Sequence, residues 1–155
     1  MKKMMQFVVM FLFVFSAAAW AQQNPFVGPW KVNLAKSKYN PGPPPAQAGT
    51  SKIDAIAGGL QFTNDGFDAA GQPTHNEWSG KFDGKDNPVK GDRNRDTAAL
   101  NKIDDYTFEI ISKKAGNVVS TIRAVFSRDG KTRTQTGQGT NAQGIKTNNT
   151  VVYEK

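Results

Sequence analysis

The sequence predicts an all-β domain of short antiparallel strands, and three observations support this fold class. Segments in which apolar and polar residues alternate recur along the chain. Turn pairs such as Asp65-Gly66, Asp83-Gly84 and Asp129-Gly130 separate these segments about every dozen residues. No window of similar length shows the apolar spacing of an amphipathic helix. We expect roughly eight to ten strands, in an antiparallel sandwich or barrel.

The first 21 residues have the organisation of a secretory signal peptide. Two lysines precede an apolar run from Phe7 to Phe15, and Ala19 and Ala21 then supply an A-x-A cleavage site. The run is shorter than the roughly 20 residues that span a membrane. We therefore expect residues 1–21 to direct export, to the periplasm or out of the cell. Residues 22–155 are expected to form the mature domain, without stable membrane insertion.

The N-terminal half of this domain contains two alternating segments and an irregular connection. Trp30, Val32 and Leu34 share one face of the first expected strand. Proline is concentrated in residues 41–49, and it cannot join a central ladder because it lacks the N–H donor. We expect a stiff surface connection there or, alternatively, a semi-rigid flap over an open barrel end. The apolar face of the next segment carries Thr74, Asn76, Trp78 and Phe82.

The C-terminal half continues the alternation in four further segments. Residues 105–113 and 117–127 each have one apolar face, and Arg123 lies on the opposite face of the second. In residues 131–139, threonines alternate with lysine, arginine and glutamine, and residues 147–154 form the expected last strand. The expected apolar faces carry Tyr106, Phe108, Ile110, Val118, Ile122, Ala124 and Phe126.

Charge and composition exclude several functions. The chain has a formal net charge of +7 and no cysteine, which excludes disulfides, thiol nucleophiles and iron–sulfur ligation by cysteine. Basic residues are interspersed with acidic ones, as in residues 83–86 and 92–96, which predicts a solvated surface of mixed charge. Stacking of nucleic acid needs aromatic rings on an exposed basic face. Because the aromatic residues alternate onto apolar faces, we expect no nucleic-acid partner.

The residue types that carry catalysis and metal binding do not cluster. His75 is the single histidine, and the alternation places it on the polar face of its strand with Glu77. A zinc site needs three or four clustered ligands. The paired aspartates fall in turns, where the side chain stabilises the bend. We therefore predict no catalytic residue, no metal site and no cofactor.

Both ends of the expected domain resemble the calycins. Gly28-Pro29-Trp30 resembles the Gly-x-Trp motif in the first strand of lipocalins and fatty-acid-binding proteins, and residues 149–155 are similar to the closing strand of the fatty-acid-binding branch. Residues 83–91 and 129–132 are similar to small exported bacterial proteins described as lipocalin-like. This resemblance implies an antiparallel up-and-down barrel, lipocalin-like, over residues 22–155.

The resemblance also implies how the barrel is closed. Gly28 allows a close approach at the barrel floor, and Trp30 plugs the closed end. An arginine of such barrels lies across the tryptophan ring as a cation–π partner. Arg123 is the first candidate for this arginine and Arg133 the second.

Two functions of different classes follow. The first is a non-enzymatic carrier that binds a small apolar or amphipathic ligand inside the barrel. The second is a structural or interaction module of the cell envelope whose barrel is filled by its own side chains; an enzyme is a distant third. Oligomeric state stays open. The expected ligand-binding residues are Phe62, Trp78, Phe82, Phe108 and Phe126. The rest of the expected interior comprises Trp30, Val32, Ile110 and Ala124. Its expected polar side chains are Thr74, Asn76, Thr134 and Thr136.

Overall fold

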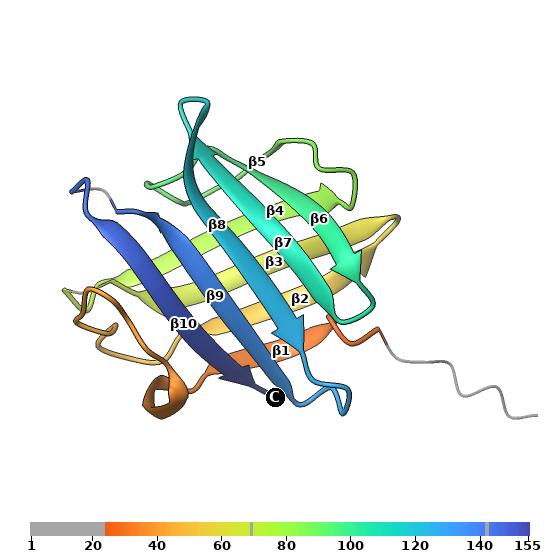
Figure 1. The fold of residues 1–155 in the computed structure, drawn as a ribbon, viewed down its shortest axis with the longest axis horizontal. Coiled ribbons are helices and arrows are strands. Elements are labelled where there is room, and N and C mark those ends of the chain that lie inside the picture. The colour runs from red at the N-terminus through yellow and green to blue at the C-terminus, as the bar shows by residue number, and fades with distance from the viewer. Residues whose placement is uncertain (1–23, 69, 142) are drawn as a thin grey trace, which may run out of the picture.

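The computed structural model describes residues 24–68, 70–141 and 143–155. A single antiparallel sheet of ten strands curls into a nearly closed barrel (Figure 1). The predicted signal peptide, residues 1–21, lies outside the described residues and stays a prediction. The strands are β1 (Gly28–Val32), β2 (Thr50–Ile56), β3 (Gly59–Phe67), β4 (Pro73–Lys81), β5 (Asn87–Pro88), β6 (Thr97–Asp104), β7 (Thr107–Lys114), β8 (Asn117–Phe126), β9 (Thr132–Thr140) and β10 (Lys146–Glu154).

The strand order is that of an up-and-down barrel. From one end of the sheet to the other it runs β4-β3-β2-β1-β10-β9-β8-β7-β6-β5, so nearly every strand pairs with its neighbours in sequence. Pairing of β1 with β10 joins the two ends of the chain, with Lys31 opposite Glu154. The all-β antiparallel fold and the predicted strand number are confirmed.

The two ends of the sheet, β4 and β5, meet at a seam. Between the middle of β4 and the chain after β5, one isolated bridge pairs Glu77 with Lys90. The Glu77 amide donates to the Lys90 carbonyl at 3.0 Å, and the Lys90 amide donates to the Glu77 carbonyl at 2.9 Å. Gly91 allows the close approach here, because a Cβ at this position would lie 2.4 Å from the His75 carbonyl oxygen. The two strands are therefore tightly packed at the seam, although few residue pairs there are joined by backbone hydrogen bonds.

An aromatic plug of Phe26, Trp30, Phe108 and Phe126 fills one end of the barrel. The Trp30 ring centroid is 5.3 Å from that of Phe126, and Phe26 lies 4.9 Å from Phe126 and 5.3 Å from Phe108. Trp30 is 1% exposed, and its Nε1 donates to the Phe26 carbonyl at 3.2 Å. The hydrogen bond matters because a buried indole N–H without a partner is costly.

The expected faces hold for most strands but not for β9. Arg133 is buried at 1% exposure, whereas Thr134 and Thr136, which were expected to face inward, lie on the opposite face. Cross-strand partners share a face, and Arg133 is paired with Phe126 of β8 and Tyr153 of β10. Both partners pack in or against the core. The alternation of β9 was correct, but its inward face is the one that carries Arg133.

The proline-rich connection between β1 and β2 is anchored at both ends. Following β1 and a single turn of 3-10 helix (Leu34–Lys36), Lys38 forms a bridge with Thr150 of β10, and Gly49 accepts a 2.9 Å hydrogen bond from the Val32 amide. Between the anchors, residues 41–48 make no backbone hydrogen bond to the described parts of the chain. We refer to residues 41–48 as the strap.

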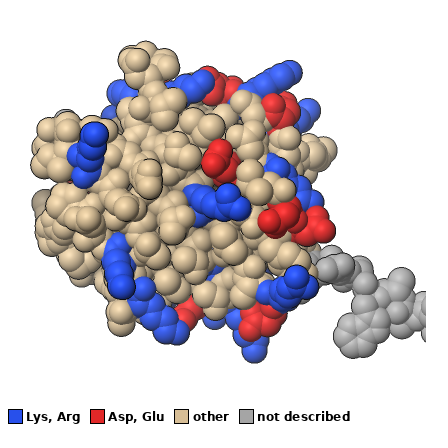
Figure 2. All heavy atoms as spheres, viewed as in Figure 1, with Lys and Arg blue, Asp and Glu red and all other residues tan. Residues whose placement is uncertain are grey.

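The outer surface carries charges of both signs. Figure 2 shows Lys and Arg spread over one face of the molecule, with Asp and Glu between them. Within the described ranges, no helix is long and apolar enough to cross a membrane.

Candidate ligand cavity

A cavity of about 310 Å³ lies inside the barrel, on the side of the strap. Its volume falls at the lower end of the range of roughly 300–1,000 Å³ for ligand sites. The lining is mixed, since apolar side chains stand beside polar groups, most of them uncharged. The apolar part includes Val32, Phe62, Trp78, Ile110, Ile122 and Val151, and the polar part includes Thr50, Ser51, Asn64, Asn76, Gln135 and Tyr153.

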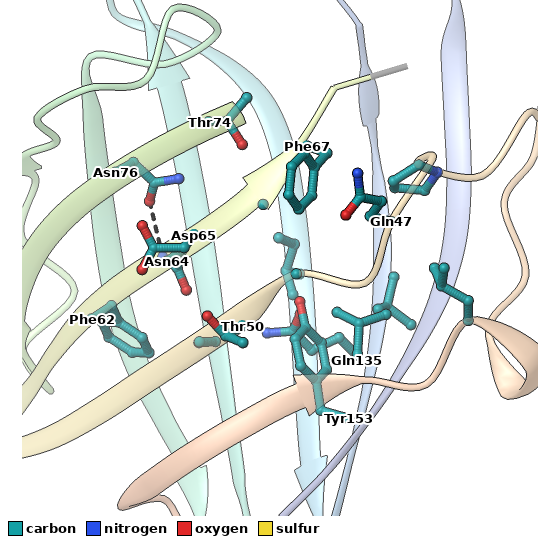
Figure 3. Close-up of a pocket in the computed structure, with 18 of the residues that line it drawn as sticks. Gln47, Thr50, Phe62, Asn64, Asp65, Phe67, Thr74, Asn76, Gln135 and Tyr153 are labelled. Atoms are coloured by element: carbon teal, nitrogen blue, oxygen red, sulfur yellow. Dashed lines mark hydrogen bonds between the residues drawn. The ribbon is translucent and has the colours of Figure 1, made fainter. Parts of the chain in front are cut away.

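Inward-facing side chains from both sides of the barrel converge on this space. Figure 3 shows Phe62 and Asn64 from β3, Asn76 from β4, Gln135 from β9 and Tyr153 from β10 around it. The Asn64 Nδ2 donates to the Asn76 Oδ1 at 2.9 Å, which orients both amides. Such convergence follows from the period-two alternation of strands, because each strand sends every second side chain inward.

The strap contributes to the mouth of the cavity. Gln47 (Figure 3) and Pro45 line it from the strap, and Tyr39 lines it from the anchored segment before the strap. The flap interpretation of the proline segment therefore describes its position better than a connection on the outer surface. Burial raises the pKa of the Tyr39 phenol above its ordinary value, so this hydroxyl is neutral at physiological pH.

Arg95 brings a guanidinium to the cavity wall. It projects from the loop between β5 and β6, and its Nε donates to the Asp92 Oδ2 at 2.8 Å. Its Nη1 donates to the Ser112 Oγ at 3.2 Å and its Nη2 to the Asn76 Oδ1 at 3.1 Å. The Arg95 guanidinium also lies 6.0 Å from the centre of the Trp78 ring. Arg95 thus links β4 to β7 across the seam, beside the cavity.

Sequence reasoning missed Arg95. It stands in a stretch of alternating acidic and basic residues, which predicted a solvated turn, yet its side chain is only 14% exposed. The i,i+3 spacing from Asp92 identifies a local ion pair, but its contacts with Asn76 and Ser112 join segments 17 to 19 residues apart. No local pattern predicts such contacts.

A second arginine, Arg133, lies beneath the cavity and covers Trp30, the role for which Arg123 was the first candidate. Arg123 is exposed on the outer face of β8, because it alternates with the inward-facing Ile122 and Ala124. The prediction that Arg123 covers the tryptophan was wrong. The second candidate, Arg133, lies 5.6 Å from the centre of the Trp30 ring.

Arg133 is enclosed by aromatic rings. The Tyr153 ring centre is 3.7 Å from its guanidinium carbon, and its Nη1 donates to the Ser51 Oγ at 3.3 Å. Its Nε and Nη2 have no hydrogen-bond partner among the described residues. Burial lowers the pKa of Arg133 to about 10, so the group still carries its charge at neutral pH.

The close approach expected at Gly28 is made by the side chain of Lys155. Gly28 has φ of +134°, and a Cβ there would lie 2.9 Å from the Lys155 Cε. The Lys155 ammonium is 4.6 Å from the centre of the Trp30 ring. Two cations, Arg133 and Lys155, therefore lie near the Trp30 ring.

The five aromatic residues expected to bind a ligand are divided between the cavity and the plug. Phe62 and Trp78 line the cavity, as a stacked pair with ring centres 4.5 Å apart. Phe108 and Phe126 are buried in the plug, and Phe82 packs against the core beside Phe26, 6.1 Å away. Phe26 precedes the first strand, so no alternation pointed to it. Its ring packs against Phe108 and Phe126 in the plug.

His75 lies outside the cavity, in a polar row on the outer face of the β3–β4 hairpin. Its Nδ1 is 2.7 Å from the Asp65 Oδ1 and its Nε2 is 3.2 Å from the Glu77 Oε1. The hydrogen bond with Asp65 is the main cause that raises the pKa of His75 above its ordinary value. In the part of the chain that is described, no three His, Cys, Asp or Glu side chains are grouped to hold a metal ion.

Comparison with known proteins identifies a similar structure. No protein-family model matches the chain, and no curated protein sequence matches it. The crystal structure of the zebrafish ileal bile acid-binding protein complexed with cholic acid aligns with a TM-score of 0.52 and 16% identity, over 84% of this chain and 98% of that chain. The strand order, the nearly closed barrel and this alignment together show that the chain has the fold of the calycins.

Proposed function

We propose that this protein is an exported carrier that binds a small amphipathic molecule in the barrel cavity. The observation that carries the proposal is a cavity with apolar walls and several convergent polar groups, a combination typical of ligand sites. The similar barrel from zebrafish holds cholic acid, which is itself amphipathic. The predicted signal peptide supports export.

The lining suggests how such a molecule is held. The stacked Phe62–Trp78 pair and Val151 offer apolar surface to the ligand body. Removing that body from water stabilises the complex by about 25 cal/mol per Å² of apolar area. Asn76 and Gln135 supply hydrogen-bonding groups that fix its orientation. The cavity volume of about 310 Å³ lies at the lower end of the range for ligand sites, so we expect a compact ligand.

The strap is the proposed entrance. It contributes Pro45 and Gln47 to the mouth, and no backbone hydrogen bond ties residues 41–48 to the sheet among the described residues. Displacing the strap therefore breaks side-chain contacts only. Opening the barrel wall would instead break paired backbone hydrogen bonds, which cost more to leave unmade.

Two matched substitutions test the carrier function. Val151 lines the cavity, whereas Val125 is 45% exposed on the outer surface. We expect Val151→Trp to fill the cavity and abolish binding of an anilinonaphthalene sulfonate probe, and Val125→Trp to leave it unchanged. Circular dichroism checks that both variants fold. Native mass spectrometry of the protein purified from its own host, with lipid extraction, then identifies the bound molecule.

The alternative, an envelope module with a filled barrel, makes the opposite prediction. Its interior binds no small molecule, so neither tryptophan substitution changes probe binding and no ligand co-purifies. That result, together with saturable binding to an anionic envelope polymer, would overturn the carrier proposal.

A further inference from the structure

Resting on the proposed carrier function, we propose that Arg95 makes the cavity selective for organic acids, by hydrogen bonding the anionic group of the ligand at the side wall. Arg95 and Asp65 are the charged residues among those that line the cavity in the described chain. Asp65 is exposed at the rim and bonded to His75. Arg95 is 14% exposed and lies against Trp78, inside the barrel wall.

The Arg95 guanidinium has donors to spare. A guanidinium carries five N–H groups, and three of them are used, by Asp92, Ser112 and Asn76. One N–H on each Nη atom therefore has no partner among the described residues. These N–H groups belong to a cation and can donate to the oxygens of a carboxylate, a sulfonate or a phosphate.

The guanidinium is also held in position before any ligand binds. Asp92 fixes it at Nε, and Ser112, which is 0% exposed, fixes it at Nη1. Asn76 fixes Nη2 and is itself oriented by Asn64. A long side chain ordered in this way loses little further conformational entropy on binding, which favours affinity.

The electrostatic balance inside the barrel favours an anion. Asp92 offsets the charge of Arg95 through the Nε contact. Arg133 lies beneath Ser51 and Tyr153, two residues of the cavity lining, and forms no ion pair with a described carboxylate. The enclosed region thus holds a surplus positive charge. Charges act more strongly there than in water because the surroundings are less polarisable.

A pair of probes that differ only in charge tests the selectivity. We expect the delipidated protein to bind decanoate at least about tenfold more tightly than decan-1-ol, as measured by calorimetry at neutral pH. Arg95→Met should weaken decanoate binding by about ten- to a hundredfold, the range for losing a hydrogen bond to a charged group. Binding of decan-1-ol should not change. Arg123→Met, on the exposed outer face of β8, is the matched control and should change neither.

A second variant decides the question if Arg95→Met does not fold. Asp92→Asn removes the offsetting charge and keeps an amide oxygen that accepts from the Arg95 Nε, so the guanidinium stays oriented. We therefore expect decanoate to bind more tightly while decan-1-ol is unaffected. Equal binding of both probes to the wild type, or unchanged or weaker decanoate binding by Asp92→Asn, overturns the selectivity but leaves the carrier function standing. Co-purification of a neutral ligand would also overturn the selectivity and leave the carrier function standing. If neither probe binds and nothing co-purifies, the carrier function itself fails.

Discussion

Trp30 shows how much of the barrel depends on one side chain. Its ring packs against Phe126, its Nε1 bonds to Phe26, and Arg133 and Lys155 lie against it. The residue therefore connects β1, β8, β9 and the end of the chain. Removing it leaves a cavity in the plug and exposes a buried guanidinium to an unfilled space.

We expect Trp30→Ala to lower the free energy of unfolding by about 3–5 kcal/mol, the usual cost of deleting a large buried aromatic side chain. Urea denaturation measures it. Val125→Ala, at a position 45% exposed, is the control and should change the midpoint little. An unaltered midpoint for Trp30→Ala would show that the plug does not stabilise the barrel.

His75 provides a residue-scale prediction with a defined sign. Its hydrogen bond with Asp65 favours the protonated ring, so the folded pKa lies above the unfolded value of about 6.5. The stabilisation from this contact is fully present below pH of about 6.5 and is lost as the pH rises through the folded pKa. Because the chain has a single histidine, an NMR titration gives its pKa directly. We expect Asp65→Asn to lower this pKa, and a wild-type value at or below 6.5 would contradict the assignment.

At the scale of elements, the strap and the seam are two parts of the described barrel with little or no backbone pairing to the rest of the sheet. They differ in how they are held. The strap lies over the cavity between its anchors on β10 and β1. The seam is closed by the paired hydrogen bonds of Glu77 and Lys90 and by the contacts of Arg95. Under the proposed carrier function, ligand exchange beneath the strap is therefore expected to cost less than exchange through the seam.

Engineered disulfides distinguish these routes, because the chain has no cysteine of its own. A Cβ built at Gly71 lies 3.9 Å from the Ala46 Cβ, within the range of about 3.5–4.5 Å for a disulfide. We expect oxidation of the double variant Ala46→Cys/Gly71→Cys to slow ligand association and dissociation by about tenfold or more, as measured by stopped-flow fluorescence. Reduction should restore both rates.

The control disulfide closes the seam. Glu77 and Lys90 exchange both backbone hydrogen bonds, and such antiparallel pairs have Cα atoms about 5.5 Å apart, which suits a disulfide. Oxidised Glu77→Cys/Lys90→Cys should exchange ligand at the wild-type rate. If the seam disulfide slows exchange and the strap disulfide does not, the entrance lies at the seam.

For the whole molecule, the barrel is divided along its axis into a plug and a cavity. The plug consists of aromatic rings in mutual contact, and the cavity begins where Phe62, Trp78 and smaller polar side chains replace them. With no disulfide available, packing in the plug supplies rigidity. The other end holds the cavity and is covered by the strap, which is the proposed entrance. Under the proposed carrier function, this division would allow one sheet to combine stability with ligand exchange.

Much of this architecture could be predicted from local patterns. Alternation and glycine turns predicted the antiparallel strands, and the Gly-x-Trp resemblance predicted the up-and-down barrel and the position of Trp30 in the core. Part of the cavity was predicted as well, since Phe62, Trp78 and Asn76 do line it. Alternation identifies which residues share a face, and it does so without knowledge of the partner strand.

Alternation by itself does not say which of the two faces turns inward, and this is where the predictions for β9 were wrong. Cross-strand pairing with Phe126 and Tyr153 buries Arg133, although arginine is usually exposed. The sequence by itself determined the strand class, the turns and the burial of the indole. Only the tertiary structure decided which arginine covers it, which rings fill the plug, and that Arg95 reaches the cavity, because these contacts join residues that are distant along the chain.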